Sequence, residues 1–338
     1  LTEIDRVSET TKFNETYLLK GDKDTKTVTV DAHDAGIEGT LTQNTTQATF
    51  VMNALNLGDT IKIGGTEYTI GSDVDAVQKA IKDASAGELI TVDGTQYTVV
   101  ATDTTTPKIN ENADKNMLTI GSIQDLVAKG STAVYKGKTY TAMTDATGAD
   151  IDVAGNGDQA VVDDQRPQVI TADKAYAMIA QELRLASSVG ATAESAHNNT
   201  SSIDAADGTA TTVVTNPATG AKDGALYAIG AAGSDYEDKI IFGIQKGTVE
   251  RKEGLTFALH VGADADMTNK ISVQIDALDT AGLGIQGLNV KDSTGASATY
   301  AIDAIADAVA HVSAQRSLLG AVQNRLEHTI NNLDNVVE

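Results

Sequence analysis

The chain has 338 residues, of which 41% are hydrophobic, so it is long enough and apolar enough for two or three globular domains. Its formal net charge is −22 and its sequence pI is about 4.4, which argues against nucleic acid or an acidic membrane surface as a partner. It contains no cysteine, which excludes disulfides, thiolate catalysis and cysteine-ligated metals, and it has no uninterrupted apolar run of membrane-spanning length.

The first ten residues, LTEIDRVSET, indicate the last turns of a helix, because Leu1, Ile4 and Val7 recur at near-helical spacing. They have no basic n-region and no apolar h-region, so they do not form a signal peptide. Because the pattern stops soon after it starts and no initiator Met precedes it, we expect the chain to have been trimmed from a longer one. Residues 12–22 then turn the chain.

Residues 22–253 are rich in Thr, Gly, Ala and Asp, and their short apolar alternations predict β structure with short helices. An internal repeat occurs here, in which two alternating strands are joined at a Gly-containing turn that is followed by x-Tyr-Thr. Turns of this composition accept positive φ and therefore favour hairpins. The three copies are residues 61–70 (turn Gly64-Gly65), 88–100 (turn Asp93-Gly94) and 131–143 (turn Lys136-Gly137).

The repeated tyrosines, Tyr68, Tyr97 and Tyr140, fit two interpretations: half-buried strand residues or a ligand-binding face. The tetrapeptide Thr-Ile-Gly-Ser also recurs, and it predicts two short helices capped by Ser72 and Ser122. The apolar residues expected to face inward from these helices are Val74, Val77, Ile81, Ile123, Leu126 and Val127.

Residues 171–196 predict the main helix of this region, with Thr171 or Asp173 as its N-terminal cap. Four of its residues fall on one stripe that we expect to be buried: Tyr176, Ile179, Leu183 and Ser187. Residues 238–248 predict a strand.

Residues 255–278 predict a hairpin of two alternating strands. Its facing apolar sets are Phe257, Leu259 and Val261 on one strand and Ile271, Val273 and Ile275 on the other.

From about residue 298 to Val337 the sequence predicts one helix, a rod of ~60 Å at ~1.5 Å per residue. Its apolar residues alternate at spacings of three and four, which predicts a heptad seam with Arg316 and Gln323 at two of its positions. The apolar members of the seam are Ile302, Ile305, Val309, Val312, Leu319, Leu326, Ile330, Leu333 and Val337. The seam needs helices alongside it, which we expect to come from trimmed sequence or from other copies.

Three segments resemble bacterial flagellin. Residues 1–19 are similar to the stretch where the second long N-terminal helix of the family ends, through Glu-Ile-Asp-Arg-Val, Thr11, Phe13-Asn14 and Leu18-Leu19. Residues 259–278 resemble the Val-Gly-Ala hairpin of the family. Residues 314–335 resemble the C-terminal helix of its helical stem.

The resemblance implies an α+β fold. Residues 1–21 and 254–338 would form a truncated, discontinuous stem of the D1 type, with the long C-terminal helix and a β-hairpin. Residues 22–253 would form a variable outer insert of repeated hairpins and short helices, organised as two nested β-rich subdomains of the D2 and D3 types. The terminal polymerisation segments and N-terminal stem helices of the family are absent, which implies a fragment that does not polymerise alone.

In function, the resemblance implies a structural subunit of the flagellar filament: extracellular, acting in motility, with no enzymatic activity and no cofactor. Other flagellin subunits would be its partners, and the vertebrate receptor TLR5 and a flagellin export chaperone are further candidates. An alternative is a flagellin-like surface protein whose insert binds a glycan or a host surface. A hook–filament junction protein is another alternative, but the close match at 314–335 favours flagellin.

The sequence predicts no catalytic, cofactor or metal site. None of the five histidines stands in a His-Glu-x-x-His motif. Asp152, Asn156 and Asp158 are spaced loosely like a calcium loop, but the rhythm of acidic residues and the terminal Glu are missing, which favours a solvated loop. The many Ser and Thr residues of the insert fit either O-glycosylation, as the resemblance implies, or β-propensity and solubility.

The predicted partner or subunit contacts lie on the C-terminal helix: Arg316, Gln323, Asn324 and Arg325. A charged residue on a helical seam costs stability unless it is exposed or paired, so these residues favour contact with another molecule. For Arg325 the resemblance implies a part in TLR5 recognition, and an intramolecular salt bridge is the alternative.

Overall fold

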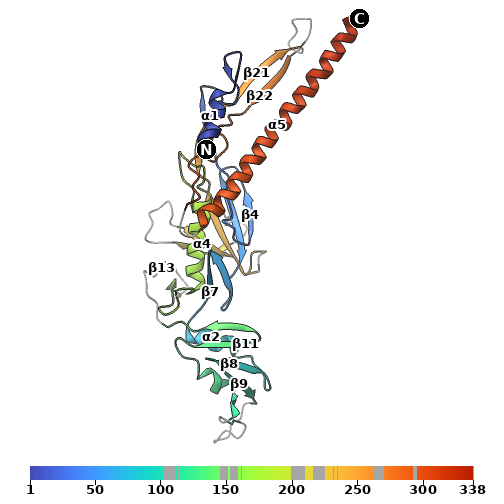
Figure 1. The fold of residues 1–338 in the computed structure, drawn as a ribbon. Coiled ribbons are helices and arrows are strands. Elements are labelled where there is room, and N and C mark those ends of the chain that lie inside the picture. Colours follow the sequence, from blue (N-terminus) through green and yellow to red (C-terminus); the bar gives the residue numbers. More distant parts are fainter. Residues whose placement is uncertain are drawn as a thin grey trace.

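The structure is a computed structural model, and Figure 1 shows an elongated molecule with the C-terminal helix at one end and a small β-rich unit at the other. We call its three parts the stem (residues 1–21 and 254–337), the middle unit (22–71 and 144–253) and the outer unit (72–143). The residues that the structure describes are 1–101, 111–112, 115–144, 151–152, 159–160, 162–198, 210–215, 225–230, 232–233, 235–261, 270–291 and 295–337.

The stem combines two helices with two short antiparallel hairpins. Its elements are α1 (Thr2–Thr10), β1 (Lys12–Phe13), β2 (Thr16–Tyr17), β21 (Leu255–His260), β22 (Lys270–Ile275) and α5 (Ala296–Val337). α1 confirms the helix predicted at the N-terminus, and α5 confirms the long C-terminal helix, with 42 residues.

The hairpin β21–β22 pairs the apolar residues of its two strands as predicted, but with a shifted register. Phe257 lies opposite Val273, and Leu255 rather than Val261 lies opposite Ile275. A shift of two residues keeps the same side chains on the same face of the sheet, which is why the alternation alone could not fix the register.

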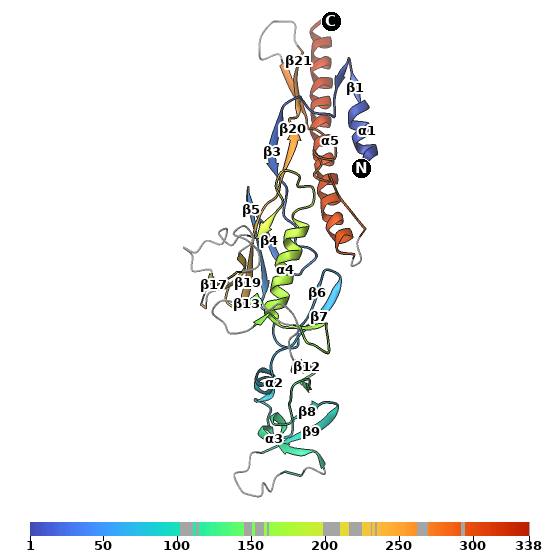
Figure 2. The same ribbon diagram turned by 90° about the vertical axis from the view of Figure 1, so that its left-hand side faces the viewer.

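A two-stranded ribbon connects the stem to the middle unit. It pairs β3 (Thr25–Thr29) with β20 (Thr248–Lys252) in antiparallel register. Figure 2 shows the two strands running beside α5, so the chain leaves the stem and returns to it along the same path.

The middle unit packs one helix against two sheets. Its larger sheet has the strand order β17-β18-β19-β5-β4, with β16 also paired to β19, and its smaller sheet has the order β15-β7-β6. The elements are β4 (Thr40–Gln43), β5 (Gln47–Asn53), β6 (Thr60–Ile63), β7 (Thr66–Ile70), β13 (Ile151–Asp152), β14 (Gln159–Ala160), β15 (Val169–Ile170), α4 (Ala172–Ala186), β16 (His197–Asn198), β17 (Ala210–Thr215), β18 (Ala225–Gly230) and β19 (Lys239–Gln245).

The core of the middle unit forms between α4 and the larger sheet. Thr171 caps α4 by accepting a hydrogen bond from the backbone N–H of Lys174, as predicted, but the helix ends at Ala186 rather than near residue 196. The predicted stripe of α4 is buried, and Tyr176 stacks edge-on against Tyr227 at 5.0 Å between ring centroids. β19 confirms the strand predicted at 238–248.

The outer unit has its own core beneath a five-stranded sheet of order β10-β9-β8-β11-β12. Tyr97 and Tyr140 pack against this core, and Tyr68 packs against the core of the middle unit, which supports the interpretation of half-buried strand residues. The elements are α2 (Val74–Ile81), β8 (Leu89–Val92), β9 (Thr95–Val100), β10 (Met117–Thr119), α3 (Ile120–Gln124), β11 (Thr132–Tyr135) and β12 (Lys138–Thr141).

All three predicted hairpins are present, as β6–β7, β8–β9 and β11–β12. Both turn residues of each hairpin have positive φ, including the non-glycine residues Asp93 (46°) and Lys136 (50°), as a tight hairpin turn requires. The copies are not equivalent in space, because the first hairpin belongs to a sheet of the middle unit and the other two share the outer sheet.

The predicted caps of the two short helices are wrong. The backbone of Ser72 still pairs as a strand, so Asp73 caps α2 instead. Thr119 caps α3 and accepts the backbone N–H of Ser122. Leu126, expected to face inward, is 41% exposed because α3 has already ended.

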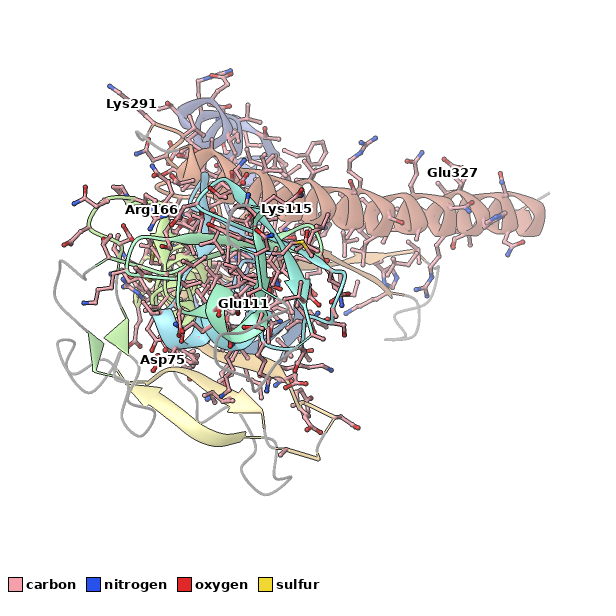
Figure 3. The ribbon with its side chains drawn as sticks, turned by 90° about the horizontal axis from the view of Figure 1, so that it is seen from below. Asp75, Glu111, Lys115, Arg166, Lys291 and Glu327 are labelled. Atoms are coloured by element: carbon pink, nitrogen blue, oxygen red, sulfur yellow. The ribbon has the colours of Figure 1, made fainter. Side chains whose placement is uncertain are left out.

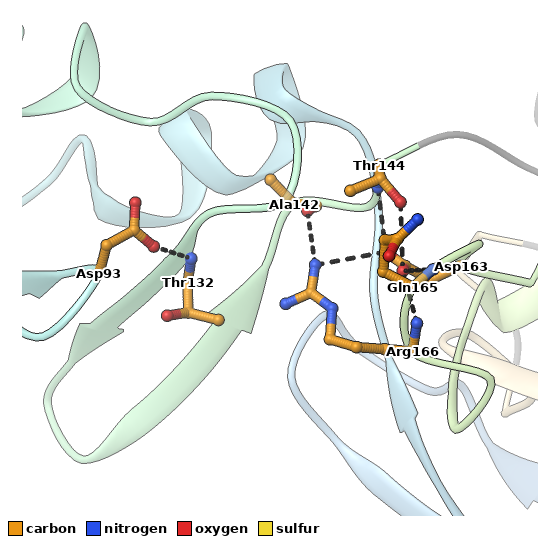
Figure 4. A network of polar contacts seen from close by, with 7 residues as sticks. All are labelled: Asp93, Thr132, Ala142, Thr144, Asp163, Gln165 and Arg166. Carbon is orange, nitrogen blue, oxygen red and sulfur yellow. Dashed lines mark hydrogen bonds and ion pairs between the residues drawn. The ribbon is translucent and has the colours of Figure 1, made fainter.

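A buried carboxylate holds the joint between the middle and outer units, as Figure 4 shows. Asp163 accepts hydrogen bonds from the backbone N–H groups of Thr144, Gln165 and Arg166, at 2.9 to 3.0 Å. The guanidinium of Arg166 lies 3.3 Å from the same carboxylate and donates to the backbone carbonyl of Ala142 at 3.2 Å. Arg166 therefore contacts Asp163 in the middle unit and the backbone of Ala142 in the outer unit, which ties the two units together.

Candidate assembly face

The first half of α5 has an inner face of small residues that packs against the rest of the stem. Ala301, Ala304 and Ala308 are each at most 6% exposed. Ala304 and Ala308 form a small core with Ile285, and Ile4 of α1 packs against the same core. Because alanine side chains are short, neighbouring backbone can lie close to this face.

Further along, polar contacts continue the inner face. The side-chain amide of Gln315 donates to the backbone carbonyl of Gln274 in β22 at 2.9 Å, and Gln315 is only 7% exposed. His311 Nε2 lies 3.5 Å from a carboxylate oxygen of Asp276. The pattern of large apolar residues does not predict these contacts, although Gln315 follows Ala308 by seven residues and so continues the same helical stripe.

A neighbouring side of α5, about 100° around the helix from the inner face, presents a second row of residues. We call this row the outer stripe: Ile302, Ile305, Val309, Arg316, Gln323 and Ile330. Spacings of three, four and seven residues align these side chains along one side of the helix. The four apolar members are 65%, 48%, 59% and 56% exposed in chain order. Such a row of exposed large apolar side chains is typical of an interaction surface.

The predicted heptad seam therefore divides between two faces. Val312, Leu319 and Leu326 are half-buried, whereas the apolar residues of the outer stripe are exposed. Within the described residues, no helix lies against the outer members of the seam. The sequence could not assign the inner face, because the pattern of large apolar residues does not reveal that alanines make the contact.

The four predicted contact residues are all exposed, but they do not share one face. Arg316 and Gln323 belong to the outer stripe, whereas Asn324 and Arg325 are turned away from Gln323 by about 100° and 200°, at 3.6 residues per turn. Gln323 donates to Glu327 at 2.9 Å, and Figure 3 shows Glu327 on the half of α5 that projects away from the other units.

Arg316 and Arg325 form no ion pair with any side chain that the structure describes. The salt bridge considered for Arg325 is therefore not seen in this part of the chain. Both guanidinium groups are available to another molecule.

The described residues bring together no three His, Asp or Glu side chains that could hold a metal ion. Asn156 and Asp158, two members of the calcium-like spacing, lie outside the described residues, so that interpretation has no structural counterpart here. Among the described helices, none is both long and apolar enough to span a membrane.

Residues 302–338 match the family model of the bacterial flagellin C-terminal helical region. The chain is 44% identical over 81 residues to the putative flagellin YvzB of Bacillus subtilis (strain 168), which is 24% of this chain and 48% of that protein. It is also 44% identical over 79 residues to a flagellin of Clostridium tyrobutyricum (22% and 21%) and over 89 residues to a flagellin of Halalkalibacterium halodurans (25% and 30%).

The chain thus spans about half of the length of the first relative and less of the other two. The family match begins at Ile302, the first residue of the outer stripe, and so contains the whole stripe. On these matches the chain is similar to bacterial flagellins over its C-terminal helical region and about a quarter of its length.

Proposed function

We propose that the chain is a subunit of the bacterial flagellar filament, acting in motility outside the cell. The outer stripe is the observation that carries this proposal. It leaves large apolar side chains exposed along a helix of 42 residues, within the region that matches flagellin. Covering such a row by another helix removes apolar surface from water and so drives association.

The covering surface would come from other stem helices in the filament. The outer stripe and the exposed apolar residues of α1, Leu1 and Val7, are different surfaces, so contact between copies would be heterologous. Heterologous contacts generate open helical assemblies when the rotation between copies does not close. Arg316 would then pair with a carboxylate of a neighbour, since the chain has 47 Asp and Glu against 25 Lys and Arg.

The proposed organisation follows the resemblance. Residues 1–21 and 254–338 would form the stem that packs in the filament, and residues 22–253 would project outward as two nested units. TLR5 and an export chaperone are proposed as further partners of the stem, with the exposed Arg325 as the candidate receptor contact.

The test replaces two residues of the outer stripe in the gene that encodes the chain. Ile305→Asp with Val309→Asp should abolish filaments in electron micrographs of the cells, because two carboxylates would have to be desolvated on assembly. Leu89→Asp is the matched control: Leu89 is 50% exposed but lies in the outer unit, so filaments should persist. Filaments of normal length from the double variant, with the protein still folded by circular dichroism, would refute the proposal.

The alternative, an insert that binds a glycan or a host surface, has no specific structural support. The repeated tyrosines that suggested it pack against the two cores instead of forming one exposed face. A glycan array probed with the whole chain tests it, and the absence of any bound glycan would remove it.

A further inference from the structure

Phe13 is the most exposed large apolar side chain among the described residues, at 75%. Of the four phenylalanines of the chain, Phe50 and Phe242 are fully buried and Phe257 is half-buried. An aromatic ring gains much from leaving water, and such rings are enriched among the residues that carry most of the energy of protein interfaces. Phe13 is therefore a candidate anchor for another surface.

The hairpin β1–β2 holds Phe13 in a defined direction. Phe13 pairs with Thr16, so the two side chains lie on the same face of the hairpin. The turn residues Asn14 and Glu15 have φ of 48° and 64°, as in a tight hairpin turn. Because a tight turn leaves the chain little freedom, burying this ring costs less conformational entropy than burying one on a flexible loop.

A pocket of about 340 Å³ lies between the C-terminal end of α4, the loop before α5 and the first turns of α5. None of its lining residues is charged, although 21% of the residues of the chain are. Leu185, Val189 and Leu288 contribute apolar side chains to the lining, and Leu185 is 42% exposed. An uncharged pocket with apolar side chains is suited to a neutral, apolar occupant.

The pocket is large enough for the side chain of Phe13. If each carbon of the benzyl group takes the ~30 Å³ of a water molecule, the group needs roughly 200 Å³. The pocket exceeds this volume, at about 340 Å³. Figure 2 shows β1 beside the upper part of α5, away from the start of the helix that lines the pocket, so Phe13 does not reach the pocket of its own chain.

We infer that Phe13 of one copy inserts into this pocket of a second copy. The inference rests on the proposed filament and adds a specific contact to it. Phe13 and the pocket are different surfaces, so the contact is heterologous, and each copy offers one ring and one pocket. Contacts of this kind extend from copy to copy without closing on themselves when the rotation between copies allows no ring.

The pocket and the hairpin each adjoin a surface of the proposed assembly. Ala301 of the pocket lies one turn before Ile305 of the outer stripe, so the two are neighbours on the surface of α5. The hairpin directly follows α1, whose exposed Leu1 and Val7 are the second surface of the filament proposal. The same two surfaces would therefore bring Phe13 and the pocket together.

The experiment uses cysteines, because the chain contains none of its own. Thr16→Cys, beside Phe13, is combined with Leu185→Cys in the gene that encodes the chain; both positions are exposed. Filaments sheared from the cells are treated with a short bismaleimide. We expect a ladder of dimers, trimers and higher oligomers on a denaturing gel, because each copy supplies one cysteine to each of two contacts.

The control combines Thr16→Cys with Leu126→Cys. Leu126 is 41% exposed, as Leu185 nearly is, but it lies in the outer unit, so no ladder should form. If Leu185→Cys does not fold, Gln286→Cys takes its place, since Gln286 is exposed and lines the same pocket.

A second measurement tests whether the ring itself enters the pocket. Phe13→Ala should raise the critical concentration for reassembly of dissociated filaments by about tenfold or more, since a large apolar side chain no longer leaves water. Tyr17→Ala is the matched control. Tyr17 is 43% exposed on the opposite face of the same hairpin, so its loss should leave the critical concentration unchanged.

The outcomes separate this inference from the filament proposal. Normal filaments with no more cross-linking than the control would overturn the contact and leave the filament proposal standing; a small apolar molecule extracted from such filaments would then be the occupant of the pocket. A ladder with an unchanged critical concentration for Phe13→Ala would also overturn the inference, because the surfaces would be neighbours without burial of the ring. The absence of filaments from the unaltered gene would overturn both proposals.

Discussion

Asp163 is the residue on which the joint between the middle and outer units depends most. Burial works to raise its pKa, but the backbone N–H groups of Thr144 and Gln165 and the guanidinium of Arg166 outweigh burial, so its pKa lies below the ordinary value. The carboxylate therefore stays ionised at neutral pH and keeps its hydrogen bonds.

Asp163→Ala should destabilise the protein by about 3 kcal/mol or more, because it leaves several buried donors and the Arg166 guanidinium without their acceptor. The measurement is the free energy of unfolding in urea, followed by circular dichroism. Asp164→Ala is the control, since the neighbouring Asp164 is exposed and its loss should change stability little. Equal stabilities of the two variants would contradict this role of Asp163.

Glu88 offers a test by pH in the outer unit. The hydroxyl of Tyr135 donates to its carboxylate at 2.6 Å, and this contact, with the N–H of Ser85 and the ammonium of Lys136, lowers the pKa of Glu88 to about 2 from 4.5. A depressed pKa adds stability above pH 4.5 that is lost as pH falls toward about 2.

The urea midpoint of the native protein should therefore fall more steeply between pH 5 and pH 2 than that of Glu88→Gln. Glu67→Gln, at an exposed glutamate of β7, should keep the native pH dependence. The contribution of Glu88 is disproved if its variant follows the native curve throughout.

At the scale of elements, two loops meet backbone to backbone near the start of α5. Gly190 follows α4 with φ of +78°, and a Cβ built on it would lie 2.0 Å from the carbonyl oxygen of Gly284, in the loop before α5. Gly190→Ala therefore adds a clash to the conformational strain, and should lower the melting temperature more than Gly137→Ala. Gly137 has φ of +79° and no atom within 4 Å of a Cβ built on it, so Gly137→Ala should be destabilised by backbone strain only. Similar melting temperatures of the two variants would show that the loops at Gly190 and Gly284 can move apart without loss of stability, and would contradict this prediction.

The elements differ in how far their sequence defines them. The three hairpins follow from turn residues that tolerate positive φ, which is a local property, and so their positions could be predicted. Their distribution over two sheets depends on contacts between distant segments, such as β15 with β7, which no local pattern encodes.

The candidate assembly face was also predictable only where a local sequence pattern defines it. Large apolar residues at heptad spacing located α5 and its outer stripe, including Arg316 and Gln323. The rotation of the helix depends on Gln315 and Gln274, which come from elements far apart in the sequence.

At the scale of the whole molecule, the comparisons and the cores agree on where the family resemblance lies. The matched family region begins on α5 and follows it to its end at Val337, in the stem, whereas the two larger cores lie in the middle and outer units. Because the inner face of α5 packs against the stem while the outer stripe faces solvent, folding and the proposed assembly would use different sides of one helix. Changes in the insert can therefore alter the exterior without altering the proposed assembly surface.

The ribbon of β3 and β20 has a consequence for how such a chain can diversify. Thr25 lies opposite Lys252, and the backbone N–H of Glu253 donates to the carbonyl of Asp24 at 2.8 Å, so the two ends of the insert are neighbours. We therefore expect inserts of different lengths between these strands to leave the separation of α1 and α5 unchanged. Inserts of different size and surface chemistry could therefore follow the ribbon without a change in the stem.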